Sequence, residues 1–173
     1  MCERVIKIFL GSSISDFEVE RADICNTIRN VSKPFEEKHH IRLEPIVCTD
    51  SDSDIERIHK FGEIDDCAMC FFIFFSREGE HTREEFERAK AAFEKHNKPT
   101  LYTYFKIIKD GSAEQSVIDF MKELESVYGY YPRMFEHIDT VKFRMLLSIK
   151  MQEIGFLDIK AEDGDCVIDG VKV

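Results

Sequence analysis

The segment from Met69 to Phe75 (MCFFIFF) is apolar at every position, and it constrains the fold more than any other part of the sequence. A strand with one face in water alternates apolar and polar residues. An unbroken apolar run instead predicts a strand that is covered on both faces, as in the middle of a parallel sheet. The longest apolar run, from Ala68 to Phe75, is far too short to span a bilayer. We therefore expect a central strand over residues 69–75 in a protein that does not cross a membrane.

Strand and helix patterns alternate on both sides of this segment. Apolar and β-branched residues predict further strands over residues 5–10, 41–48 and 100–105, and a short extended piece near Met134. Helical spacing predicts helices over residues 17–34, 55–64, 83–97, 113–127 and 138–154. Asp16 is expected to cap the first helix, Pro34 to end it, and Pro45 to mark an edge strand or an irregularity. This order predicts an α/β fold with an open, mostly parallel sheet of about five strands and helices on both faces.

The chain divides into a main part and a short tail. A length of 173 residues fits one domain, which we place at residues 1–157. In the tail, residues 158–173, the turn signals Asp163-Gly164 and Asp169-Gly170 flank a short apolar stretch, Cys166 to Ile168. We expect this tail to be a connection to a downstream domain, or alternatively an edge hairpin.

Charge and the N-terminal sequence exclude several classes of protein. The formal net charge is −10 and the sequence pI is near 5.1. A protein that binds the nucleic-acid backbone needs a positive surface, so direct nucleic-acid contact is not expected. Signal-peptide features are absent, because the acidic Glu3 lies at the start and the apolar run from Val5 to Leu10 is short. We therefore expect a cytoplasmic protein.

The six cysteines are expected to be reduced and mostly buried. Cys67 and Cys70 form a C-x-x-C motif, but a redox pair usually lies where a strand gives way to a helix N-terminus, and this pair precedes a strand. A second pair at zinc-like spacing does not follow, so we expect no metal site. The pair His39-His40 is expected on an exposed turn.

Doubly wound sheets bind their ligands at the carboxyl ends of the strands. The loops expected there are Gly11 to Ser15, Thr49 to Ser53 and Ser76 to His81. The first of these offers small residues and hydroxyls, which let a ligand approach backbone N–H groups. Neither the phosphate-loop pattern Gly-x-x-x-x-Gly-Lys nor the dinucleotide pattern G-x-G-x-x-G is present. The sequence thus argues against an ATPase and against a Rossmann dehydrogenase.

The helix after the third loop carries a carboxylate in its first turn. Its inward stripe begins with Thr82 and Phe86, and at about 100° per residue Glu85 lies at the boundary of that stripe while Glu84 points nearly opposite. Glu84 is therefore expected in solvent, and Glu85 near the ligand edge of the sheet, where a carboxylate can act on a bound ribose. Alternatively, Thr82-x-x-Glu85 is a capping box with Thr82 at the N-cap, which the spacing alone favours.

Two stretches resemble known families. The opening, Ile8-Phe9-Leu10-Gly11-Ser12-Ser13 with Asp16-Phe17 and Glu20-Arg21, resembles the start of TIR-like domains of bacterial multidomain proteins. The second, Thr82-x-x-Glu85-Phe86-x-x-Ala89, is similar to the helix start Thr-x-x-Glu-Ile-Gly-x-Ala of nucleoside 2-deoxyribosyltransferases. These families share a flavodoxin-like sheet and a glutamate, on the helix after the central strand, that acts on an N-glycosidic bond. The resemblance covers residues 5–105.

The resemblance to bacterial TIR-like domains implies an NAD+ glycohydrolase, which cleaves the nicotinamide–ribose bond of NAD+ and needs no cofactor. It implies that Glu85 is the catalytic residue. Water as the acceptor gives ADP-ribose, and an internal nucleophile gives a cyclic product. The substrate-binding residues are then expected on the three loops and the helices that follow them: Gly11, Ser12, Ser13, Asp16, Arg21, Asp50, Ser76 and Thr82.

Some of these roles have alternatives. Arg21 either pairs with the diphosphate of NAD+ or forms a surface ion pair with Glu18 or Asp16. Phe75 and Tyr104 either flank the base of the nucleotide or pack within the sheet.

The same resemblance implies a role in bacterial antiphage defence, with a homo-oligomer on activation and a sensor domain downstream in the same chain. Two other functions stay open. One is a non-catalytic TIR-like module for self-association and signalling. The other is an enzyme like the nucleoside 2-deoxyribosyltransferases, although Glu87 stands where those enzymes have glycine and Arg77-Glu78-Gly79-Glu80 replaces their aspartate-rich ligand loop.

Overall fold

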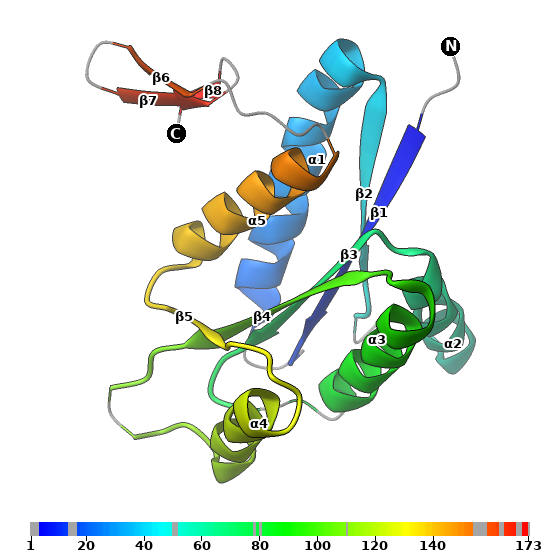
Figure 1. The fold of residues 1–173 in the computed structure, drawn as a ribbon, viewed down its shortest axis with the longest axis vertical. Helices are drawn as coiled ribbons and strands as arrows, with labels where there is room; N and C mark the ends of the chain where they lie inside the picture. The colour runs from blue at the N-terminus through cyan, green and yellow to red at the C-terminus, as the bar shows by residue number, and fades with distance from the viewer. Residues whose placement is uncertain are drawn as a thin grey trace.

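The structure is a computed structural model that describes residues 4–13, 17–49, 52–77, 79, 81–109 and 111–153, with the strand residues 159–162, 165–168 and 171–172. Its main sheet has five strands, all parallel (Figure 1). In chain order they are β1 (Arg4–Ser12), β2 (Ile41–Val47), β3 (Met69–Phe74), β4 (Thr100–Lys106) and β5 (Arg133–Phe135). Their order across the sheet is β2-β1-β3-β4-β5, which makes β3 the central strand. This confirms the predicted α/β class with a flavodoxin-like open sheet.

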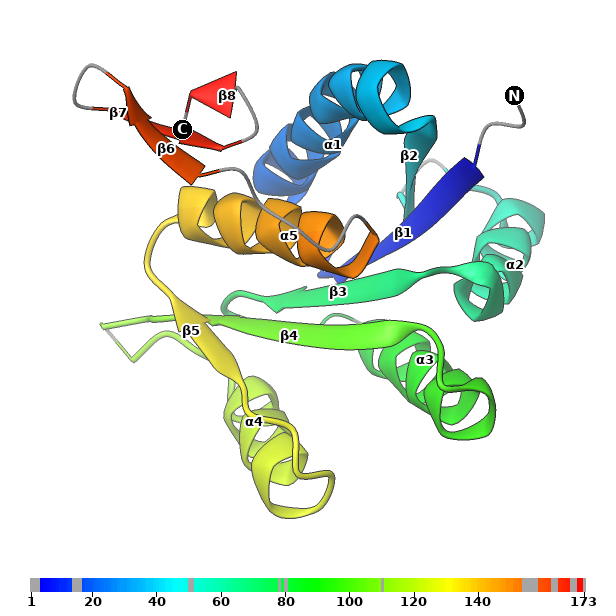
Figure 2. The ribbon, with the colours of Figure 1, turned by 45° about the horizontal axis from the view of Figure 1, so that its top comes forward.

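Helices cover both faces of the sheet (Figure 2). They are α1 (Glu18–His39), α2 (Asp54–Glu63), α3 (Thr82–His96), α4 (Gln115–Ser126) and α5 (Ile138–Glu153). Buried residues of α1 and α5 form one core with the sheet, and those of α3 and α4 form the other. In the described part of the chain, no helix has both the length and the apolar character that crossing a membrane requires.

The central strand β3 is buried at every residue, as its sequence predicts. Phe71 and Ile73 pack into the core under α1 and α5, whereas Phe72 and Phe74 pack into the core under α3 and α4. Because successive side chains of a strand point to opposite faces, a strand with helices on both sides needs apolar residues throughout. The ring of Phe74 also stacks on Phe105 of β4, with ring centroids 4.7 Å apart.

The predicted end of the first helix at Pro34 is wrong. Helix α1 continues through Pro34 to His39 and ends at His40, which adopts the left-handed conformation with φ 56°. A proline inside a helix removes one backbone hydrogen bond. Here the turn after Pro34 still packs Phe35 against the core, which offsets that loss. His39 is therefore helical and half-buried, and only His40 lies exposed beyond the helix.

Pro45 lies in β2 opposite Ile8 of β1, and β2 is an edge strand, as predicted. Strand β2 also carries the exposed charged residues Arg42 and Glu44. A proline is tolerated at such a position because an edge strand pairs on one side only.

The tail forms a second, antiparallel sheet of three short strands, β6 (Ile159–Glu162), β7 (Asp165–Ile168) and β8 (Val171–Lys172). The predicted turn residues Asp163, Gly164, Asp169 and Gly170 lie outside the described residues. The domain boundary at residues 157–158 stays a prediction.

Candidate functional site

Two of the three expected ligand loops meet at the carboxyl edge of the sheet. At Gly11 and at Gly79, the backbone lies close to atoms of another segment. A Cβ atom added to Gly11, near the end of β1, would lie 3.1 Å from Oε2 of Glu85. Gly79, in the loop between β3 and α3, has φ +80°, and a Cβ there would lie 2.8 Å from Cα of Ser13 and 2.7 Å from Oγ1 of Thr82. The structure thus brings Gly11, Ser13, Thr82 and Glu85 together.

Glu85 is buried in the first turn of α3, with 6% of its surface exposed, whereas the side chain of Glu84 is 72% exposed, as predicted. The capping box predicted as the alternative is not formed. The N-cap is His81, which has no side-chain cap, and the Glu85 N–H donates to the His81 carbonyl at 3.0 Å. Thr82 is already the first helical residue, so the Glu85 side chain is directed to Gly11 instead of back to the helix start.

Cys48, directly after β2, contacts Glu85 from the far side of β1. Its thiol donates a hydrogen bond to the Glu85 carboxylate. Burial raises the pKa of Glu85 to about 7, although this hydrogen bond and the positive charges of Arg57 and Arg21 act to lower it. Burial, and then the adjacent Glu85, raise the pKa of Cys48 to about 12. At neutral pH, Cys48 is therefore a protonated donor, and Glu85 is poised between its two charge states.

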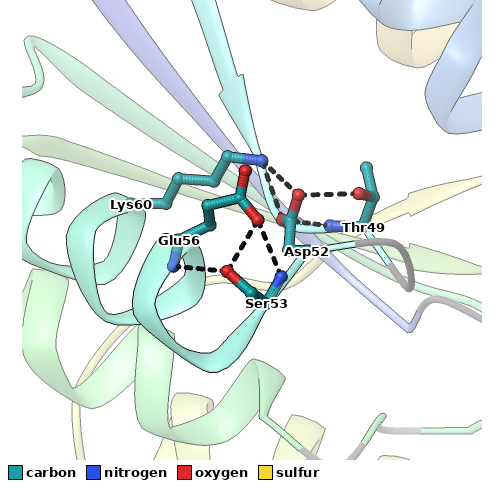
Figure 3. Close-up of polar contacts among 5 residues, drawn as sticks. All are labelled: Thr49, Asp52, Ser53, Glu56 and Lys60. Atoms are coloured by element: carbon teal, nitrogen blue, oxygen red, sulfur yellow. Dashed lines mark hydrogen bonds and ion pairs between the residues drawn. The ribbon is translucent and has the colours of Figure 1, made fainter.

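The loop between β2 and α2 is held in place by Asp52 (Figure 3). Its carboxylate accepts hydrogen bonds from the Thr49 N–H at 2.7 Å and the Thr49 hydroxyl at 2.9 Å. Lys60 of α2 donates to both carboxylate oxygens of Asp52, each at 2.7 Å. Because Thr49 follows Cys48 directly, this network fixes the backbone that presents the Cys48 thiol to Glu85.

The same loop ends in a capping box at the start of α2 (Figure 3). The Glu56 carboxylate accepts from the Ser53 N–H at 2.8 Å, and the Ser53 hydroxyl accepts from the Glu56 N–H at 3.3 Å. Two backbone donors at the helix start are thereby satisfied.

Replacing Ser53 with alanine is expected to lower the free energy of unfolding by about 1 kcal/mol, because one helix N–H loses its acceptor. Urea denaturation followed by circular dichroism measures this change. The control is Ser126→Ala, since the Ser126 hydroxyl only donates to the Lys122 carbonyl within the same helix, at 2.7 Å. Equal stabilities of the Ser53 variant and the parent chain would contradict the role of the cap.

Arg21 and Arg57 lie on the two sides of this site. Arg21, on α1, is 5% exposed, so it does not form the alternative surface ion pair with Glu18, whereas Asp16 lies outside the described residues. Arg57, on α2, is a neighbour of the site that the sequence does not reveal. The apolar residues of α2 have helical spacing and are expected to face the core. Instead Ile55 and Ile58 are 80% and 72% exposed, and α2 is turned so that Nε of Arg57 is buried.

The other predicted site residues have mixed positions. Ser12 ends β1 and is buried, and its hydroxyl makes no hydrogen bond. Ser76 is half-buried, and its carbonyl accepts from the Glu114 N–H at 2.7 Å, which ties the third loop to α4. Asp16 and Asp50 lie outside the described residues.

Neither aromatic residue predicted near a base has an open ring face. Tyr104 is completely buried in β4. Phe75 packs on Phe17 and Phe135, with ring centroids 4.7 and 5.7 Å away. Both therefore act as packing residues in this structure.

Cys67 and Cys70 are buried and form no disulfide with each other, as the interpretation of a structural pair predicts. The Cys67 thiol donates to the Glu63 carbonyl at 3.3 Å, and burial raises the pKa of Cys70 well above its usual range. Within the described residues, no group of three or more histidine, cysteine, aspartate or glutamate side chains is arranged to hold a metal ion.

Comparison of the chain with protein-family models, curated proteins and solved structures gives no significant match.

Proposed function

We propose that this chain is an NAD+ glycohydrolase that uses Glu85 to cleave the bond between nicotinamide and ribose. The observation that carries the proposal is the Glu85 carboxylate, buried at the carboxyl edge of the sheet beside Gly11 and near the Cys48 thiol. Ligands of open α/β sheets bind at this edge. The resemblance to TIR-like domains supports the same role for Glu85.

The chemistry requires little from the protein beyond a placed negative charge. Nicotinamide leaves NAD+ as a neutral molecule, and the ribose becomes a positively charged oxocarbenium ion. A carboxylate beside that ribose stabilises the charge, and its effect is larger in a buried site than in water. Water then adds to the ribose carbon and loses a proton, which gives ADP-ribose.

Binding of the substrate is assigned to the loops around Glu85. Gly11 and the adjacent Ser12 and Ser13 are assigned to a ribose or phosphate, because the end of β1 lies beside the Glu85 carboxylate. The resemblance further supports a cytoplasmic protein of antiphage defence that assembles into a homo-oligomer and is controlled by a downstream domain.

Activity is expected to rise with pH. Since Glu85 acts as a carboxylate and its pKa in the free protein is about 7, kcat/KM for nicotinamide release should be half-maximal near pH 7 and fall at lower pH. The measurement is nicotinamide release from NAD+ by chromatography, at several pH values and at high protein concentration. A rate that is constant from pH 5 to pH 8 would contradict the role of the carboxylate.

A non-catalytic association module is the second candidate, because Ile55 and Ile58 on α2 form an exposed apolar pair at i and i+3. The absence of nicotinamide release from concentrated, self-associated protein would favour this function. Base exchange between deoxynucleosides and free bases would instead favour a deoxyribosyltransferase.

A further inference from the structure

Arg21 is a buried cation that forms no ion pair with any residue described by the structure. It is 5% exposed, and among the residues that the structure describes none forms an ion pair or a side-chain hydrogen bond with its guanidinium. Burial of an unpaired charge is costly, so buried arginines in folded proteins are normally paired. A buried arginine without an ion pair is therefore a candidate to pair with an anionic ligand.

Two more buried polar groups in this region lack partners. Nε of Arg57 and the hydroxyl of Ser12 are buried, and neither makes a hydrogen bond. Buried donors without acceptors are rare in folded proteins and each calls for a physical reason. The Arg57 guanidinium, like that of Arg21, forms no ion pair with any described residue, although the charges of both act on the Glu85 carboxylate.

These groups come from both layers of the fold. In the sheet, Ser12 of β1 lies opposite Ile73 of β3. The side chain of Ile73 packs in the core under α1, which is the helix that carries Arg21. Arg57 belongs to α2, which lies with α3 on the opposite face of the sheet (Figure 2). The sheet separates these two layers of helices. One ligand can reach residues of both layers only beyond the carboxyl end of β1. A ligand that contacts both arginines therefore lies across that end and needs two anionic groups.

We propose that Arg21, Arg57 and the Ser12 hydroxyl bind the diphosphate of a dinucleotide across the carboxyl end of β1. One guanidinium then pairs with each phosphate, and Ser12 donates to a phosphate oxygen. The inference deepens the proposed function, on which it rests for the position of the ribose at Glu85. It also separates the substrate classes, because a nucleoside has no phosphate and would leave both arginines unpaired.

The experiment compares ADP-ribose with adenosine, which shares the base and a ribose but carries no phosphate. Isothermal titration calorimetry with the full chain is expected to give tighter binding of ADP-ribose by about tenfold or more, with an affinity that falls as salt is added. Arg21→Gln and Arg57→Gln are each expected to weaken ADP-ribose binding by about tenfold to a hundredfold and to leave adenosine binding unchanged. Arg88→Gln is the control, because Arg88 is already paired with Asp65 at 2.6 Å.

Thermal unfolding without ligand checks that the variants are folded. The midpoints of Arg21→Gln and Arg57→Gln are expected to match the parent value or exceed it, because each removes an unpaired charge, and added ADP-ribose should raise the parent midpoint more than theirs. Equal affinity for ADP-ribose and adenosine, unchanged ADP-ribose affinity in both variants, or no binding of ADP-ribose would overturn the inference. Diphosphate-dependent binding without nicotinamide release would uphold it and overturn the proposed function.

Discussion

Glu85→Gln is expected to reduce nicotinamide release by roughly a hundredfold or more, because the ribose cation loses the only charge that the first turn of α3 directs toward Gly11. Glutamine keeps the size of the side chain and can still accept the hydrogen bond of Cys48. Loss of activity in this variant therefore reports the charge and not the packing. Chromatography of nicotinamide, at equal protein concentration and at pH 8, measures the effect.

The same substitution is expected to stabilise the folded chain at high pH. The pKa of Glu85 is about 7 in the folded protein and 4.5 in an unfolded chain, so the folded state binds the extra proton between these values and loses stability as pH rises through them. At roughly 1.4 kcal/mol for each pH unit, the loss above pH 7 is about 3 kcal/mol. Urea denaturation should find Glu85→Gln more stable than the parent by about this amount at pH 8, and equal to it near pH 4.

Glu84→Gln is the matched control for both effects, since the Glu84 side chain is 72% exposed on the same turn. It should leave the rate at pH 8 unchanged and shift the pH dependence of stability only slightly, because the Glu84 charge raises the pKa of Glu85 less than burial does. Parent-like cleavage by Glu85→Gln would disprove the catalytic assignment. If the stability of Glu85→Gln changed with pH as that of the parent does, the pKa of Glu85 would not be raised by burial in the folded chain.

Gly11→Ala is expected to cost about 1–3 kcal/mol of stability and to lower activity by roughly tenfold to a hundredfold. The new Cβ would lie 2.5 Å from Cδ1 of Phe72 and 3.1 Å from the Glu85 carboxylate. The Phe72 ring cannot easily move, because it is completely buried and packs edge-on against Phe86 at 5.4 Å between centroids. The carboxylate is then displaced from its position beside the end of β1.

Gly62→Ala provides the control, because a Cβ at Gly62, within α2, would meet no atom within 4 Å. Alanine in a helix is favoured over glycine, so this variant should gain about 0.5–1 kcal/mol and keep its activity. Urea denaturation and the nicotinamide assay compare both variants with the parent. If Gly11→Ala is as stable and as active as Gly62→Ala, the close approach of β1 to α3 is not required.

The sheet could be predicted because its signal is local. An all-apolar strand such as β3 needs cover on both faces, whatever the rest of the chain does, and the alternation of elements then gives the class of fold. The end of α1 could not be predicted from Pro34, since the gain that carries the helix past it comes from Phe35 packing against other elements.

The two Ser/Thr-x-x-Glu sequences show the limit for the site. Ser53 and Glu56 form a capping box, whereas Thr82 and Glu85 have the same spacing and do not. The difference lies in the backbone: Ser53 is extended at the N-cap, but His81 takes that place before Thr82, so Glu85 is buried against β1. Contacts between distant segments decide this, and for the same reason the sequence did not reveal Cys48 and Arg57 as neighbours of Glu85.

The edges of the main sheet restrict how copies of this chain can meet. At one edge, β2 offers a proline without an N–H and the exposed charges of Arg42 and Glu44. At the other, β5 has only three residues, Arg133 to Phe135. Strand-to-strand addition, a route to fibres for many sheet proteins, is disfavoured at both. Copies that associate elsewhere than at these two edges leave the internal register of the main sheet, and with it the spacing between Gly11 and Glu85, undisturbed by assembly.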